Sequence, residues 1–142
     1  AFLDLLSVTE VLFLNMTEAH KVARTENGEE IRSIMLKLKA LGPHYVVVTD
    51  GQNGAFAFDG QQLDHVPMFP GKRIEATGAG DAFASGFLGA LIKGKKHGEA
   101  LRWGSVNGAS AVGSVGPTLG LLTHTEIQAR LKARKSYKSQ EV

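Results

Sequence analysis

Two short runs of consecutive apolar residues constrain the fold of this chain more than any other feature of its sequence. They are Val11–Leu14 and Tyr45–Val48, and each is continuously apolar rather than alternating. Such runs are typical of parallel strands that are buried on both faces of a sheet. Between them, residues 29–41 have the periodicity of an amphipathic helix, which Gly42 and Pro43 end. Strand, helix and strand in this order predict a parallel crossover and an α/β fold.

A β-hairpin is predicted after the second strand. Residues 55–58 and 62–66 are rich in apolar side chains, and Asp59 and Gly60 between them are turn residues. Two prolines, Pro67 and Pro70, then predict a short extended link. The sheet is therefore expected to combine parallel strands with a hairpin.

Helices are predicted for the rest of the chain. The first runs from Asp81 to about Lys93, and residues 94–98, which include His97, are expected to form a solvated loop. The second, residues 99–112, is rich in small side chains, which favour close helix packing or contact with a flat ligand. A third begins at a capping box formed by Thr123 and Glu126. Residues 136–142 are expected to be a disordered tail.

Composition excludes several classes of protein. The 142 residues carry a net charge of +2, and the basic excess lies mostly in residues 132–138, which argues against nucleic acid binding. No apolar run reaches the ~18 residues of a membrane span. The absence of cysteine excludes disulfides and thiolate metal sites and fits a cytoplasmic protein.

Polar and glycine-rich segments follow the predicted strands and precede the first long helix. They are residues 15–18, 49–54 and 77–83. Open α/β sheets bind ligands at the carboxyl ends of their strands. In the third segment, Gly78 and Gly80 permit a close backbone approach to a ligand, and a helix start suits an anion. Asp81 is then either a helix cap or a base beside an anion site.

Together these segments resemble the motifs of the ribokinase (PfkB) family of carbohydrate kinases. The run Thr77-Gly78-Ala79-Gly80-Asp81-Ala82-Phe83 is similar to the family's C-terminal signature. Asn15-Met16-Thr17-Glu18 resembles its N-x-x-E motif, and Thr49-Asp50-Gly51-Gln52-Asn53-Gly54 its T-x-G-x-x-G nucleotide loop. The resemblance implies a ribokinase-like three-layer α/β/α sandwich. Residues 1–135 would be its C-terminal, nucleotide-binding portion, without the N-terminal half that supplies substrate pocket and lid.

The resemblance implies ATP-dependent phosphorylation of a sugar hydroxyl. Asp81 would be the general base, and the backbone N–H groups of Gly78, Ala79 and Gly80 would form an anion hole. Asn15 and Glu18 would organise Mg²⁺ through water, since this cation keeps much of its hydration. From the residues alone, the alternative role of Asn15 and Glu18 is simple helix capping. The ATP site would be lined by residues of the nucleotide loop and of a later helix: Thr49, Gly51, Gly54, Ser105 and Asn107.

Many family members also bind a monovalent cation such as K⁺ beside the anion hole. The matching positions in this sequence are Glu75, Thr77, Ala111, Ser114, Gly116 and Gly120. The family usually has Asp where this chain has Glu75, which is one methylene longer. The cation site is therefore an open expectation.

Alternatives remain for the acceptor and for catalysis. A nucleoside or a sugar phosphate could replace the sugar, and a fragment could bind nucleotide without catalysis. We expect the chain to be part of a longer protein, to be inactive alone, and to associate through uncovered faces, a homodimer being one form. A dinucleotide-binding Rossmann domain ranks low because the first strand lacks G-x-G-x-x-G after it.

Overall fold

The computed structural model describes residues 2–72, 77–113 and 120–142. No helix within these ranges is both long enough and apolar enough to cross a bilayer. The helices and strands follow one another in this order: α1 (Phe2–Leu6), β1 (Val11–Asn15), α2 (Met16–Ala23), α3 (Ile31–Lys39), β2 (Tyr45–Thr49), the 3₁₀ turn η1 (Gly51–Asn53), β3 (Ala55–Phe58), β4 (Leu63–Val66), α4 (Ala79–Ile92), α5 (His97–Val112), α6 (His124–Ala133) and β5 (Gln140–Glu141).

The strands form one mixed sheet in the order β1-β2-β3-β4-β5. β1 and β2 are parallel, with Leu12 opposite Val46. β2 pairs with β3, and β3 with β4, in antiparallel fashion. The parallel pair and the hairpin predicted from the sequence are both confirmed. Since β3 follows β2 at once and runs back beside it, the loop between them lies at the carboxyl end of β2.

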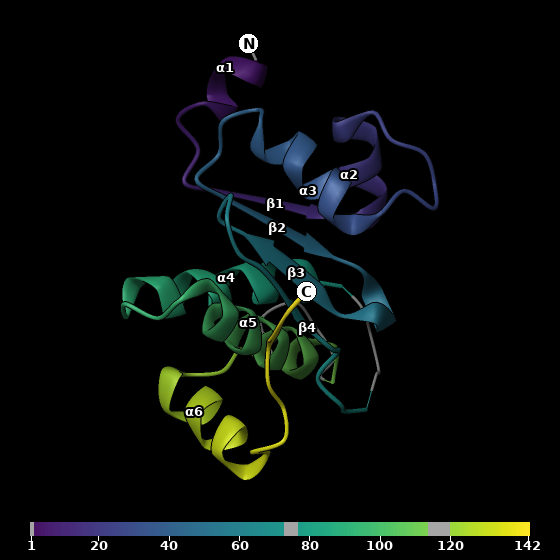
Figure 1. Ribbon diagram of the computed structural model, residues 1–142. Helices are drawn as coiled ribbons and strands as arrows, with labels where there is room; N and C mark the ends of the chain where they lie inside the picture. Colours follow the sequence, from purple (N-terminus) through teal and green to yellow (C-terminus); the bar gives the residue numbers. More distant parts are fainter. Residues whose placement is uncertain (1, 73–76, 114–119) are drawn as a thin grey trace.

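Helices cover both faces of the sheet (Figure 1). α2 and α3 pack on one face, where they bury Val46, Val48 and Phe58. α4, α5 and α6 lie on the other side, where Val47 belongs to the core. Because neighbouring side chains of a strand point to opposite faces, a strand covered on both sides needs apolar residues throughout. The predicted three-layer α/β/α architecture is confirmed.

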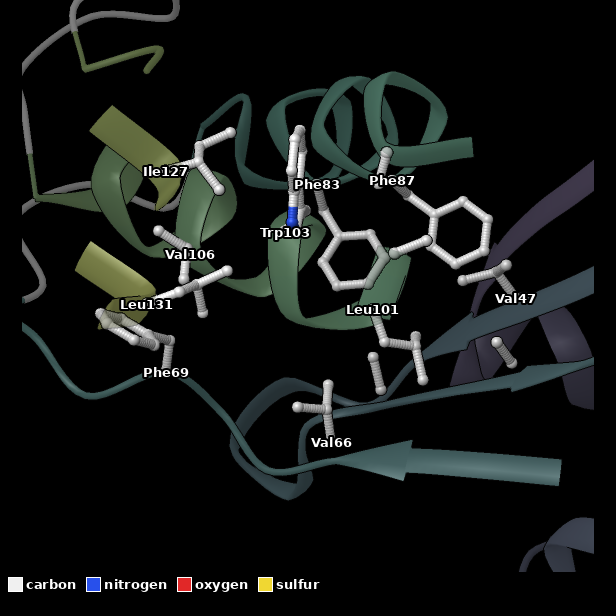
Figure 2. Close-up of a cluster of buried hydrophobic side chains, with 14 of the residues drawn as sticks. Val47, Val66, Phe69, Phe83, Phe87, Leu101, Trp103, Val106, Ile127 and Leu131 are labelled. Carbon is white, nitrogen blue, oxygen red and sulfur yellow. The ribbon is translucent and has the colours of Figure 1, made fainter. Parts of the chain in front are cut away.

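The two central helices, α4 and α5, approach so closely that two positions of their contact have no room for a side chain. A Cβ on Gly86 would lie 2.8 Å from the carbonyl oxygen of Trp103, and one on Gly104 would lie 2.9 Å from that of Phe83. Figure 2 shows the large side chains around this contact, among them Phe83, Phe87 and Trp103. The small residues of α5 therefore serve helix packing.

The loop expected at residues 94–98 is shorter than predicted, because His97 begins α5 and is buried. Its Nε2 lies 3.0 Å from Asp64 Oδ2, at an angle outside hydrogen-bond geometry. A Cβ on Gly98 would lie 2.6 Å from the same carboxylate oxygen, so Gly98 makes room for Asp64. The partner of His97 comes from β4, which the local sequence could not indicate.

The chain after α6 is ordered in the structure, where a disordered tail was expected. Tyr137 is buried, and its hydroxyl donates a hydrogen bond of 2.7 Å to the carbonyl oxygen of Pro67. β5 then pairs with β4, with His65 opposite Gln140. The buried side chain of Tyr137 and the pairing of β5 with the edge of β4 supply the contacts that hold this segment in place.

Part of the apolar pattern of α4 faces solvent. Phe83 and Phe87 are buried, but Leu88 and Ile92 are 40% and 84% exposed. In the same described residues, β1 has only β2 as a strand neighbour. Exposed apolar side chains of this kind are suited to burial against another surface.

We expect Gly86→Ala to destabilise the fold by about 1–3 kcal/mol, because the new Cβ would overlap the carbonyl oxygen of Trp103. Gly89→Ala, on the same helix, is the control, since nothing lies within 4 Å of its Cβ position. Replacing a helical glycine with alanine there should stabilise by up to ~1 kcal/mol. Urea unfolding followed by circular dichroism measures both, and equal shifts in one direction would contradict the packing role.

A second prediction concerns alkaline stability. Burial raises the pKa of the Tyr137 hydroxyl from 10.0 to about 12. The unfolded phenol loses its proton near pH 10, so the stability contributed by Tyr137 is fully present below that pH. It is lost as the pH rises through about 12. In Tyr137→Phe this loss should be absent, and the difference in urea midpoint from the unsubstituted protein should shrink between pH 10 and pH 12. A difference in urea midpoint that stays constant from pH 10 to pH 12 would contradict the raised pKa of Tyr137.

Candidate active site

The start of α4 has the backbone geometry of an anion site. Gly78 is its N-cap, with a φ of 81° that favours glycine over other residues. The first backbone hydrogen bond of the helix runs from Ala82 N to the Gly78 carbonyl oxygen at 2.9 Å. The N–H groups of Ala79, Gly80 and Asp81 precede that bond, at the positive end of the helix dipole. They can therefore donate to an anion.

Asp81 lies in the first turn of α4 and not at the cap. The helix begins two residues before the predicted start, and its N-cap residue, Gly78, has no side chain to cap it. The Asp81 carboxylate is exposed. The capping alternative for this residue is wrong. The carboxylate is accessible to a second molecule near the free N–H groups of Ala79, Gly80 and Asp81, which we call the anion cradle.

The nucleotide-loop motif forms a tight, internally bonded turn. Asp50 N donates to the Gly54 carbonyl oxygen at 2.8 Å, and Asn53 Nδ2 donates to Asp50 Oδ2 at 2.9 Å. Gly54 has a φ of 95°, and a Cβ there would lie 2.0 Å from the carbonyl oxygen of Val66. Only glycine fits this position, because the loop passes directly over β4.

A cavity of about 180 Å³ joins this loop to the start of α4. Its walls come from both glycine-rich segments, from the link after the hairpin and from α5: Thr49, Gly51, Gly54, Ala55, Met68, Phe69, Gly71, Lys72, Ala79, Gly80, Phe83, Ser105, Gly108, Ala109 and Val112. The structure thus brings together the predicted residues Thr49, Gly51, Gly54, Ala79, Gly80 and Ser105.

Ser105 also supports the wall of this cavity. Its Oγ accepts a hydrogen bond of 3.1 Å from the backbone N–H of Phe69. This bond ties the extended link to α5. The hydroxyl of Ser105 therefore positions the apolar side of the cavity.

A second hollow, of about 460 Å³, contains the N-x-x-E motif. Asn15 and Glu18 line it together with Thr49 and Gly51, which also line the first cavity. The two hollows are therefore neighbours at the carboxyl end of β2. Lys21 and Asp50 add a cation and a further carboxylate to the second hollow.

Asn15 and Glu18 form a reciprocal helix cap. Glu18 N donates to Asn15 Oδ1, and Asn15 N donates to Glu18 Oε2, each at 2.9 Å. The capping role considered from the sequence is confirmed. Only one carboxylate oxygen of Glu18 takes part in this cap, and both residues are exposed.

The donor set fits a hydrated Mg²⁺ and not a fully protein-bound ion. Within the described ranges, no three His, Cys, Asp or Glu side chains are grouped so that they could hold a metal. Mg²⁺ commonly keeps several waters and uses one or two carboxylates together with substrate phosphates. Glu18, with Asn15 beside it, can supply such outer contacts.

Asn107, which was predicted to bind the nucleotide, lies apart from the cavity. Asn107 is buried, its Nδ2 donating to the Ala82 carbonyl oxygen at 2.7 Å and its Oδ1 accepting from Leu122 N at 2.9 Å. It does not line the cavity, because both ends of its amide join α5 to neighbouring segments.

For the monovalent cation, Glu75, Ser114 and Gly116 lie outside the described residues. Thr77, Ala111 and Gly120 are described, and none of them lines the cavity between α4 and the loop at residues 49–54. The monovalent cation site stays a prediction.

Sequence reasoning missed several residues of the site. Met68, Phe69 and Lys72 line the cavity from the extended link. The prolines on either side of Met68 and Phe69 indicated an extended segment, but nothing local showed that it would fold against α5. Val112 was missed because the helix that carries it was interpreted mainly through its small residues.

The comparisons with known proteins agree with this geometry. The family model described as pfkB family carbohydrate kinase matches residues 1–124. A cytidine kinase of Thermococcus kodakarensis is 32% identical over 103 residues, covering 71% of this chain and 36% of the relative. A ribokinase of Arabidopsis thaliana is 33% identical over 104 residues, covering 70% of this chain and 27% of the relative.

Solved structures have the same fold. The structure of Arabidopsis thaliana ribokinase complexed with ribose and ATP superposes with a TM-score of 0.83 at 28% identity, covering 92% of this chain and 43% of that one. A Thermotoga maritima ribokinase superposes with a TM-score of 0.80 at 27% identity, covering 92% and 44%. The chain therefore spans less than half the length of these relatives. With most of its length matched by the family model, the chain belongs to the pfkB family of carbohydrate kinases.

Proposed function

We propose that the protein to which this chain belongs transfers the γ-phosphoryl group of ATP to a hydroxyl of a sugar-type acceptor. The observation that carries the proposal is the start of α4, where Gly78 and the N–H groups after it adjoin a cavity that is also lined by the glycine-rich loop at residues 49–54. The named ribokinase relative, whose structure contains ribose and ATP, supports both substrates.

In this proposal the chain's own groups divide the reaction between them. The Asp81 carboxylate takes the proton of the acceptor hydroxyl, whose oxygen forms a bond to the γ-phosphorus. The bond from that phosphorus to the bridging oxygen breaks, and ADP leaves. The N–H groups at the start of α4 donate to the phosphoryl oxygens while charge develops on them. Such positioned donors cost no reorganisation during transfer.

The nucleotide would occupy the cavity between the loop at residues 49–54 and α5. Phe69 and Val112 give it apolar walls, and Lys72 adds a positive charge at its edge. Mg²⁺, when bound, would neutralise phosphate charge. Asn15 and Glu18 would hold its water ligands in the adjoining hollow.

The acceptor pocket would come from a further part of the protein. The exposed Leu88 and Ile92 on α4 support this, because apolar side chains on the helix that carries Asp81 are suited to burial. A nucleoside is the second candidate acceptor, favoured by the likeness to a cytidine kinase. A chain that binds nucleotide without catalysis is the remaining alternative.

We expect Asp81→Asn to lower kcat by about 10²–10⁴-fold while the affinity for ATP changes little, because the amide cannot accept the proton. Ser85→Ala, one turn further along the exposed side of α4, is the matched control and should leave kcat unchanged. A coupled assay of ADP release over a panel of sugars and nucleosides gives kcat, and calorimetry gives ATP binding. Unchanged turnover in Asp81→Asn would refute the role of the base, and ATP binding without turnover on any acceptor would favour the non-catalytic alternative.

The variant Glu18→Gln distinguishes the role of Glu18 in capping α2 from its proposed role in holding Mg²⁺. Glutamine at this position can still accept the Asn15 N–H bond, so the free energy of unfolding should change by less than about 0.5 kcal/mol. Loss of the negative charge should raise the Mg²⁺ concentration for half-maximal rate by about 10–100-fold. Glu26→Gln, which removes the same charge outside the hollow, is the control. An unchanged Mg²⁺ requirement in Glu18→Gln would exclude Glu18 from the metal site.

A further inference from the structure

A third hollow, of about 480 Å³, adjoins the nucleotide cavity through Met68 and has no assigned role. It lies between the end of β4, the extended link and the segment after α6. We call it the tail groove, and its basic side chains are His65, Arg134 and Lys138. None of the described residues that line it has a carboxylate side chain.

Arg134 and Lys138 have free charges in the tail groove. The Arg134 guanidinium carbon lies 5.5 Å from the centroid of the Phe69 ring, a contact that leaves its N–H groups available. Among the described residues, neither Arg134 nor Lys138 forms a salt bridge. Two uncompensated cations over a concave surface attract anions to it.

The walls of the groove are held in place by contacts between segments far apart in the sequence. The Tyr137 hydroxyl donates to the carbonyl oxygen of Pro67 at 2.7 Å, and His65 Nε2 donates to that of Asn53 at 2.7 Å. Tyr137 also packs edge-on against Phe69, with ring centroids 4.9 Å apart. The groove is thus fixed by the same contacts that order the chain after α6.

We infer that the tail groove binds a small multivalent oxyanion, a phosphorylated or polycarboxylate molecule. The planar fork of arginine can donate to two oxygens of one such group, and lysine supplies a point charge beside it. The basic residues 132–138, which the kinase activity does not use, then fall into two groups. Arg134 and Lys138 line the groove, whereas Lys132 and Lys135 do not. The site is separate from the anion cradle of α4 and does not depend on the proposed kinase activity.

The experiment is a titration of the ¹⁵N-labelled protein with pyrophosphate and, separately, with citrate, followed by amide chemical shifts. Saturable shifts are expected at Ser136, Tyr137 and Gln140 in the tail groove, independent of any shifts at residues 78–82. The double variant Arg134→Gln with Lys138→Gln should weaken binding at least about tenfold. The double variant Lys132→Gln with Lys135→Gln removes the same charge outside the groove and should change the affinity by less than about twofold.

Tighter binding of pyrophosphate would identify a phosphorylated ligand, and tighter binding of citrate a polycarboxylate. Equal weakening in the two double variants would overturn the inference, because the attraction would then be that of net charge alone. Shifts confined to residues 78–82, or no saturation of the groove amides by about 10 mM, would overturn it as well.

Discussion

The contact between α4 and α5 is the constraint on which the site depends. Gly86 and Gly104 remove the side chains between the two backbones. Gly108 extends this contact to the first residue of α4, since a Cβ there would lie 3.2 Å from the Ala79 carbonyl oxygen. The first turn of α4 is therefore fixed directly against α5, whose Ser105 lines the same cavity. Helix packing thus determines where the free N–H groups of α4 lie relative to this cavity.

The sheet supplies the other half of the site. Burial on both faces holds β2 at the centre of the three layers, and its carboxyl end carries the glycine-rich loop. Thr49 and Gly51 line both the nucleotide cavity and the hollow of the N-x-x-E motif. Since β1 runs parallel to β2, Asn15 and Thr49 are register partners, which brings their motifs together despite 33 intervening positions in the chain. The parallel pairing is the reason that two motifs far apart in the sequence lie at one edge of the sheet.

Short sequence patterns correctly predicted those helices and strands that are determined by neighbouring residues. The apolar runs gave β1 and β2, and the Thr123–Glu126 capping box correctly gave the start of α6. Partners far apart in sequence were not predictable in this way: His97 pairs with Asp64, and Tyr137 with the carbonyl of Pro67. For Asn107, a polar residue on a helix of small residues favoured a ligand contact, whereas the structure buries it. The fold and the main loops therefore followed from the sequence, and the contacts that order the tail did not.

Asn15 and Glu18 show that a structural role and a functional one need not compete. From the sequence, the helix cap and the metal site were alternatives. In the structure the cap uses Oε2 of Glu18, and it fixes the orientation of the whole carboxylate at the edge of the hollow. A carboxylate already held in one rotamer loses less side-chain entropy when it orders the waters of a cation. The cap would then prepare Glu18 for Mg²⁺, and both interpretations would describe the same geometry.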